Sequence, residues 1–123
     1  MSIMAAKDEL GRAGEERAVA HLTRLGYRIL DRNWRCDQGE LDIVALHQDT
    51  LAFVEVKTRR TLDFGHPFEA IDASKRQRLW RLAHAWVRDH RRESLGRTLR
   101  VEAIGIVGAD PAIGALEHLR DLR

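Results

Sequence analysis

Three strand-like segments in a row, joined by short polar turns, constrain the fold of this chain most. They span 27–34, 40–46 and 51–58, and apolar residues alternate with polar ones or run in β-branched stretches. The turns at 37–39 and 47–50 are too short to hold a crossover connection. The sequence therefore predicts an antiparallel meander.

Two amphipathic helices flank this meander. The first is predicted over 7–25, ends at Gly26, and carries Ala18, Leu22 and Leu25 on one stripe, with Glu15 in line with that stripe. The second is predicted from an Asp72 cap to about 92, with an apolar stripe opposite a stripe of arginines. A strand over 98–107 follows, and 115–119 is either a short strand or a helical turn.

The order helix, three strands, helix, strand predicts a sheet with helices packed on it, of α/β or α+β class. A length of 123 residues predicts one domain over 1–123. The single Cys36, the charges at 7–9 where a signal peptide would need an apolar core, and the absence of a long apolar run predict a cytoplasmic protein with no membrane segment.

Charged residues interrupt the second and third predicted strands. Alternation places Glu40 and Asp42 on one face of their strand, and Glu55 and Lys57 on one face of the next. Acids are depleted inside strands, so their presence between apolar neighbours suggests a role in chemistry. If the strands pair, two carboxylates and an ammonium converge, and hard oxygen ligands of this kind suit Mg²⁺.

Simpler interpretations stay open at this point. The same charges fit solvated cross-strand ion pairs on an exposed face. Glu15 on the helix stripe needs a cation or metal as partner if it is buried, or it is an acid near a helix N-terminus that the helix dipole favours.

The motifs together resemble one family. Their residues are Gly14-Glu15, Gly26-Tyr27, Arg32-Asn33-Trp34-Arg35, Gly39-Glu40-Leu41-Asp42-Ile43-Val44, Phe53-Val54-Glu55-Val56-Lys57-Thr58-Arg59, Phe64-Gly65-His66-Pro67, Ala70 and Lys75. Over about 11–106, this pattern resembles the bacterial YraN family of endonuclease-like proteins, which in turn resembles archaeal Holliday junction resolvases of the PD-(D/E)xK superfamily. The resemblance implies a restriction-endonuclease-like α/β core, a mixed sheet flanked by helices in the order α-β-β-β-α-β.

The resemblance also implies roles for individual residues. Asp42 and Glu55 match the metal-binding acids, and Lys57 matches the residue that orients or activates the attacking water. Glu15 matches the helix acid of the resolvase-like branch, and Glu40 belongs to the family's Gly-Glu signature. Mg²⁺, with Mn²⁺ as a substitute, is the implied cofactor. The pattern departs at Glu102, where the family more often has aspartate, and Glu102 is left without a role.

The implied activity is hydrolysis of phosphodiester bonds in structured or branched DNA during repair or recombination, by a homodimer. Eighteen arginines suit phosphate contacts, although the net charge is only +2. The residues expected to contact the nucleic-acid backbone are Arg59, Arg60, Lys75, Arg78 and Arg81. Trp34 and Trp80 are candidates for stacking on bases. The alternatives are an RNA nuclease and a non-catalytic nucleic-acid-binding or protein-interaction module.

Overall fold

The computed structural model describes residues 3–122; Met1, Ser2 and Arg123, which the predicted domain includes, lie outside the described residues. The elements are α1 (Ile3–Arg24), β1 (Arg28–Cys36), β2 (Gly39–His47), β3 (Thr50–Arg59), the 3₁₀ helix η1 (Pro67–Ala70), α2 (Ala73–Asp89), α3 (Arg91–Ser94), β4 (Thr98–Val107) and β5 (Ala115–Leu119).

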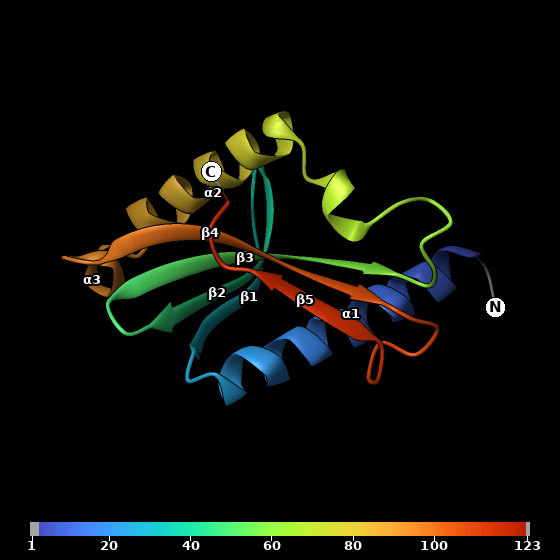
Figure 1. The fold of residues 1–123 in the computed structure, drawn as a ribbon. Coiled ribbons are helices and arrows are strands. Elements are labelled where there is room, and N and C mark those ends of the chain that lie inside the picture. Colours follow the sequence, from blue (N-terminus) through green and yellow to red (C-terminus); the bar gives the residue numbers. More distant parts are fainter. Residues whose placement is uncertain (1–2, 123) are drawn as a thin grey trace.

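The five strands form one mixed sheet in the order β1-β2-β3-β4-β5. The predicted meander is confirmed, because β1 to β3 pair antiparallel in sequence. Strand β4 pairs parallel with β3. The crossover through α2 returns the chain to the end of the sheet where β3 begins, so Thr98 pairs with Thr50. Figure 1 shows α1 below the sheet and α2 above it. The predicted α/β class, a mixed sheet flanked by helices, is therefore confirmed.

Each face of the sheet has its own hydrophobic core. Under α2, Leu79, Leu82 and Trp86 pack on a cluster that includes Phe53 and Val101. Under α1, Ala18 and Leu22 pack on a second cluster from β2, β3 and β4. Apart from Leu25, the predicted helix stripes are thus buried against the sheet, with the two helices on opposite faces.

Several predicted boundaries are wrong in detail. Leu25 is exposed and not part of the buried stripe, because α1 ends at Arg24 and the chain turns at Gly26, whose φ is +91°. Helix α2 ends at Asp89, and 91–94 form a separate short turn of helix. Of the two alternatives predicted for 115–119, the structure has the strand, because its backbone pairs with β4. Within residues 3–122, no helix is long and apolar enough to cross a membrane.

Candidate active site

The candidate site lies where β2 and β3 separate. Their pairing runs from His47↔Thr50 only as far as Ile43↔Val54. The first residues of β2 pair with β1 alone, and this hairpin rises away from the sheet toward α2 (Figure 1). At the split, Asp42 Oδ2 accepts a hydrogen bond from the Val56 N–H at 2.8 Å. That bond holds the Asp42 carboxyl beside the stretch of β3 that carries Glu55 and Lys57.

Glu55 is the buried centre of the site. Its side chain is only 5% exposed, and its Oε1 lies 3.2 Å from the Lys57 Nζ and 3.2 Å from the Lys75 Nζ. Lys57 is its neighbour along β3, whereas Lys75 reaches it from the first turn of α2. The Glu55–Lys57 ion pair therefore exists, but it is not the solvated surface pair considered as the simpler interpretation.

Asp42 and Glu55 are close enough to affect each other's charge. Burial raises the pKa of Asp42 to about 7, and the nearby Glu55 carboxylate adds to the rise, with a smaller contribution from Glu15. The Val56 hydrogen bond and the Lys57 charge oppose it only in part. A perturbed carboxyl beside a second acid is a typical feature of functional sites.

Glu15 approaches the same region from α1. A side chain at Gly14 would collide with Thr58 Oγ1, so the glycine lets the helix pack directly on β3. Burial raises the pKa of Glu15, the Asn33 hydrogen bond opposes this, and Glu40 and Glu55 add repulsion. The helix acid therefore lies within electrostatic reach of the strand acids.

Asn33 joins Glu15 to Glu40. With its amide nitrogen turned toward the carboxylates, Asn33 donates to Glu40 Oε1 at 3.0 Å and to Glu15 Oε2 at 3.1 Å. Its φ of +52° is uncommon for a non-glycine residue inside a strand, and asparagine tolerates it best. On its other side, Glu40 Oε2 lies 3.2 Å from Arg35 Nε.

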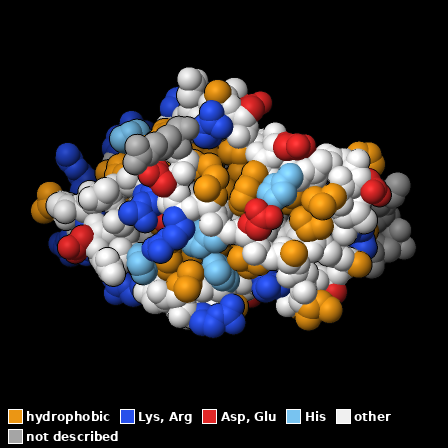
Figure 2. Space-filling view, viewed as in Figure 1, with side chains coloured by type: hydrophobic (Ala, Val, Ile, Leu, Met, Phe, Trp, Pro, Cys, Tyr) orange, Lys and Arg blue, Asp and Glu red, His pale blue; other side chains and the backbone are white. Residues whose placement is uncertain are grey.

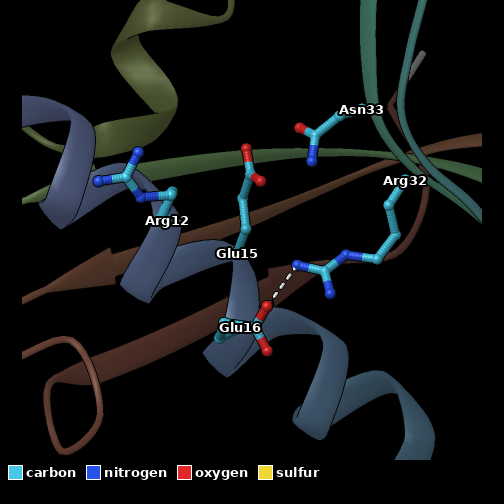
Figure 3. Close-up of a pocket in the computed structure, with 5 residues that line it drawn as sticks. All are labelled: Arg12, Glu15, Glu16, Arg32 and Asn33. Atoms are coloured by element: carbon cyan, nitrogen blue, oxygen red, sulfur yellow. Dashed lines mark hydrogen bonds and ion pairs between the residues drawn. The ribbon is translucent and has the colours of Figure 1, made fainter.

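Two pockets lined mostly by charged side chains adjoin the site, one through Glu15 and the other through Lys75. One, of about 390 Å³, opens between α1 and β1 and is lined by Arg12, Glu15, Glu16, Arg32 and Asn33 (Figure 3). Arg32 and Glu16 form an ion pair of 2.7 Å across it. The other, of about 410 Å³, lies at the start of α2 and is lined by Ala70, Asp72, Ser74, Lys75, Arg78 and Arg81. Both give polar surfaces beside the site.

The predicted basic residues divide into two groups. Lys75, Arg78 and Arg81 share the pocket at α2, and Lys75 also reaches Glu55. Arg59 ends β3, with its Nε buried and without a hydrogen-bond partner, and Arg60 is exposed in the loop that follows.

The tryptophan candidates for base stacking are partly covered by the core under α2. Trp34 and Trp80 are half-buried and pack against the core under α2. Trp86 is fully buried, and its Nε1 donates to Asp31 Oδ2 at 3.0 Å.

Comparison with known proteins identifies the family. Residues 14–106 match the model of the uncharacterised protein family UPF0102. The chain belongs to family UPF0102. A UPF0102 protein of Paenarthrobacter aurescens is 50% identical over 120 residues, which is 98% of each chain. One from Arthrobacter is 51% identical over 95% of this chain and 98% of its own. One from Caldicellulosiruptor saccharolyticus is 54% identical over 66% of this chain and 69% of its own. The family resemblance predicted from the motifs is confirmed.

The UPF0102 match also includes Glu102, which lies on the opposite face of the sheet. Glu102 is fully buried and accepts hydrogen bonds from the Tyr27 hydroxyl at 3.0 Å and from His118 Nε2 at 2.6 Å. Its register partner is Val54, next to Glu55, whose side chain points to the α2 side of the sheet. Glu102 is thus part of a buried network behind the site and does not contact it.

Sequence reasoning missed two features of the site in this UPF0102 chain. The motif Arg32-Asn33-Trp34-Arg35 gives Asn33 no role of its own, although an asparagine inside a strand is itself a signal of unusual backbone. Lys75 was expected to contact nucleic acid, and nothing in the sequence shows that the start of α2 lies over Glu55. That contact depends on how the crossover returns across the sheet.

Proposed function

We propose that this UPF0102 protein is a Mg²⁺-dependent endonuclease that hydrolyses phosphodiester bonds in structured or branched DNA. The observation that carries the proposal is the convergence of Asp42, Glu55 and Lys57 at the split between β2 and β3. Glu55 is buried, and Asp42 is half-buried, with burial as the main cause of its raised pKa. A solvated surface pair would need neither burial nor convergence.

The acids fit Mg²⁺ by their chemistry. Among the residues that the structure describes, no group of three or more His, Cys, Asp or Glu side chains is arranged to hold a metal ion. Mg²⁺ does not require such a group, because it keeps several waters and takes one or two carboxylates together with substrate phosphates. The raised pKa of Asp42 fits the same interpretation, since burial and a neighbouring carboxylate disfavour its charge and a cation would favour it.

Each residue then has a defined task. Asp42 and Glu55 would hold the ion, which when bound supplies charge stabilisation for the phosphate oxygens. Lys57, beside Glu55 Oε1, orients the attacking water. Lys75 approaches the same oxygen from α2 and so links the acid to the basic pocket that it shares with Arg78 and Arg81. That pocket would contact phosphates on one side of the cleaved bond, without reading the bases.

The proposed activity also implies an oligomeric state, a cellular location and an alternative substrate. A symmetric branched substrate has two strands to cut, so we expect a two-fold homodimer. The site of action is the cytoplasm, where DNA repair and recombination take place in bacteria. RNA is the alternative substrate for the same residues.

One observation favours a second candidate, a non-catalytic module on a nuclease fold. Two lysine ammoniums lie on Glu55 Oε1 and compensate its charge without a metal ion. Metal binding separates the candidates. We expect the wild-type chain to bind Mn²⁺ in calorimetry at pH 8, and Asp42→Asn and Glu55→Gln each to weaken binding at least tenfold. Asp63→Asn, an exposed acid, serves as the control. Undiminished binding in both site variants would reject the proposed metal centre.

A further inference from the structure

One large aromatic side chain outside the proposed machinery is almost fully exposed. Phe64 is 91% exposed, and Leu62 on the same loop is 59% exposed. Both lie in the segment 60–66 that follows β3. In Figure 1 this loop lies at the right-hand end of the sheet, and Figure 2, in the same view, shows hydrophobic side chains scattered over the centre and right of the surface.

The loop that carries Phe64 is held in place on both sides. The Gly65 N–H donates to the Leu62 carbonyl at 2.9 Å, which closes a turn around Phe64. Gly65 has a φ of +94°, and a side chain there would collide with the Glu69 carboxylate. His66 Nδ1 accepts from the Phe68 N–H at 3.0 Å, while its Nε2 contacts Glu117 Oε1 at 3.0 Å. The exposed ring therefore lies on an anchored turn, so its exposure does not come from a loose segment.

The loop lies beside the candidate site. Gly105 is the register partner of both Lys57 on β3 and Glu117 on β5. A side chain at Gly105 would press on Pro67 and Phe68, so η1 rests directly on that position. With strands about 4.8 Å apart, Lys57 and Glu117 are separated by roughly 10 Å between Cα atoms. His66 contacts Glu117, and Phe64 precedes His66 by two residues, so the Phe64 turn lies near the Lys57 end of the site.

Positive charge accompanies the ring. Arg59 and Arg60 lie between Lys57 and the Phe64 turn, and Arg60 is exposed. The buried Nε of Arg59 has no hydrogen-bond partner. A ligand that suits both features presents a flat apolar surface together with negative charge. A nucleotide with an unpaired base meets this requirement, because the base stacks on an aromatic ring and the phosphates meet the arginines.

We propose that Phe64 is a stacking residue that selects nucleic acid with an unpaired base a few nucleotides from the cleaved bond. This inference rests on the proposed function, and it adds a determinant of substrate structure. A base inside a duplex has no free face to offer Phe64, so fully paired DNA would not gain from the contact.

The test compares four proteins in EDTA, where binding is measured without cleavage. Fluorescence anisotropy gives the affinity of the wild type, Phe64→Ala, Phe64→Trp and Leu95→Ala for a flap, a four-way junction with an unpaired bulge, and a plain duplex. Leu95 is the matched control, because it is 87% exposed and lies near the start of β4, away from the loop. A second series removes one base at a time from the unpaired strand by introducing abasic sites.

We expect Phe64→Ala to weaken binding of the flap and bulge by about 5- to 150-fold, the factor that one base–aromatic stack contributes. Phe64→Trp keeps the wild-type affinity for the flap and the bulge. Leu95→Ala binds all three DNAs as the wild type does, and Phe64→Ala leaves the affinity for the duplex unchanged. In the wild type, an abasic site at one position of the unpaired strand reproduces this loss of affinity. The same abasic site weakens the binding of Phe64→Ala no further. Equal losses on flap and duplex, or wild-type affinity in Phe64→Ala, would overturn the inference. If the wild type binds none of the nucleic acids, the proposed function itself fails; Phe64-dependent binding without cleavage in Mg²⁺ rejects only the catalytic part.

Discussion

The raised pKa of Asp42 makes a specific prediction about stability. The pKa rises from an ordinary 3.8 to about 7 on folding, because burial and Glu55 disfavour the charged form. The unfolded chain therefore loses this proton near pH 4, whereas the folded chain keeps it until about pH 7. The free energy of unfolding is therefore unaffected by Asp42 below pH 4, and it falls as the pH rises from 4 to 7. At 1.36 kcal/mol per unit, a shift of about 3 units costs the folded state at most about 4 kcal/mol at pH 8.

Replacing Asp42 by asparagine removes this cost. Asparagine has no charge to bury and keeps an oxygen that accepts the Val56 N–H. In urea denaturation with EDTA, we expect Asp42→Asn to match the wild type at pH 4 and to exceed its free energy of unfolding by up to about 4 kcal/mol at pH 8. Asp63→Asn, an exposed acid, should follow the wild type throughout.

Adding Mg²⁺ completes this experiment. An ion held by Asp42 stabilises the folded wild type by about 2.7 kcal/mol at a hundredfold excess over the dissociation constant, whereas the tenfold or weaker binding expected for Asp42→Asn stabilises that variant by at most about 1.4 kcal/mol at the same ion concentration. A difference between variant and wild type that stays constant from pH 4 to pH 8 would refute the reasoning, because the carboxyl would then not titrate near neutrality.

The other predictions concern the supports of the site. Gly14→Ala drives a methyl group into Thr58, and we expect a loss of about 1–3 kcal/mol in the free energy of unfolding; Gly11→Ala in the same helix meets no atom within 4 Å and should stabilise by up to about 1 kcal/mol. Equal effects in thermal denaturation would contradict the close approach of α1 to β3. Glu102→Gln weakens the 2.6 Å bond to His118, and we expect the free energy of unfolding in urea at pH 7 to fall by about 2–4 kcal/mol. An unchanged free energy of unfolding would show that the Glu102 carboxylate does not stabilise the fold.

Most of the secondary structure was predictable because its signals are local. The strand over 98–107 was predicted with the bounds that β4 has, and the Asp72 cap of α2 accepts the Lys75 N–H at 2.8 Å as such a residue should. Where the boundaries were wrong, as at Leu25, the helix ended one residue before the apolar pattern did. Hydrophobic spacing alone does not place that turn.

The arrangement of the site was only partly predictable. Period-two alternation placed Glu55 and Lys57 on one face, and this is a local property of β3. The split between β2 and β3 that frees Asp42, and the return of Lys75 over Glu55, depend on tertiary packing. The residue type at Asn33 indicates the left-handed backbone, but the contact of its amide with Glu15 and Glu40 depends on how α1 packs on the sheet.

The most direct test of the central claim is cleavage of end-labelled single-stranded DNA, duplex, flap, four-way junction and RNA in Mg²⁺ or Mn²⁺. Glu55→Gln and Lys57→Met run beside the wild type, with Glu93→Gln on α3 as a control on an exposed acid. The account predicts metal-dependent cutting of a branched DNA that both site variants lose by at least a hundredfold and the control keeps. Cutting that persists in both site variants, or a wild type that cuts none of the five substrates, would contradict it.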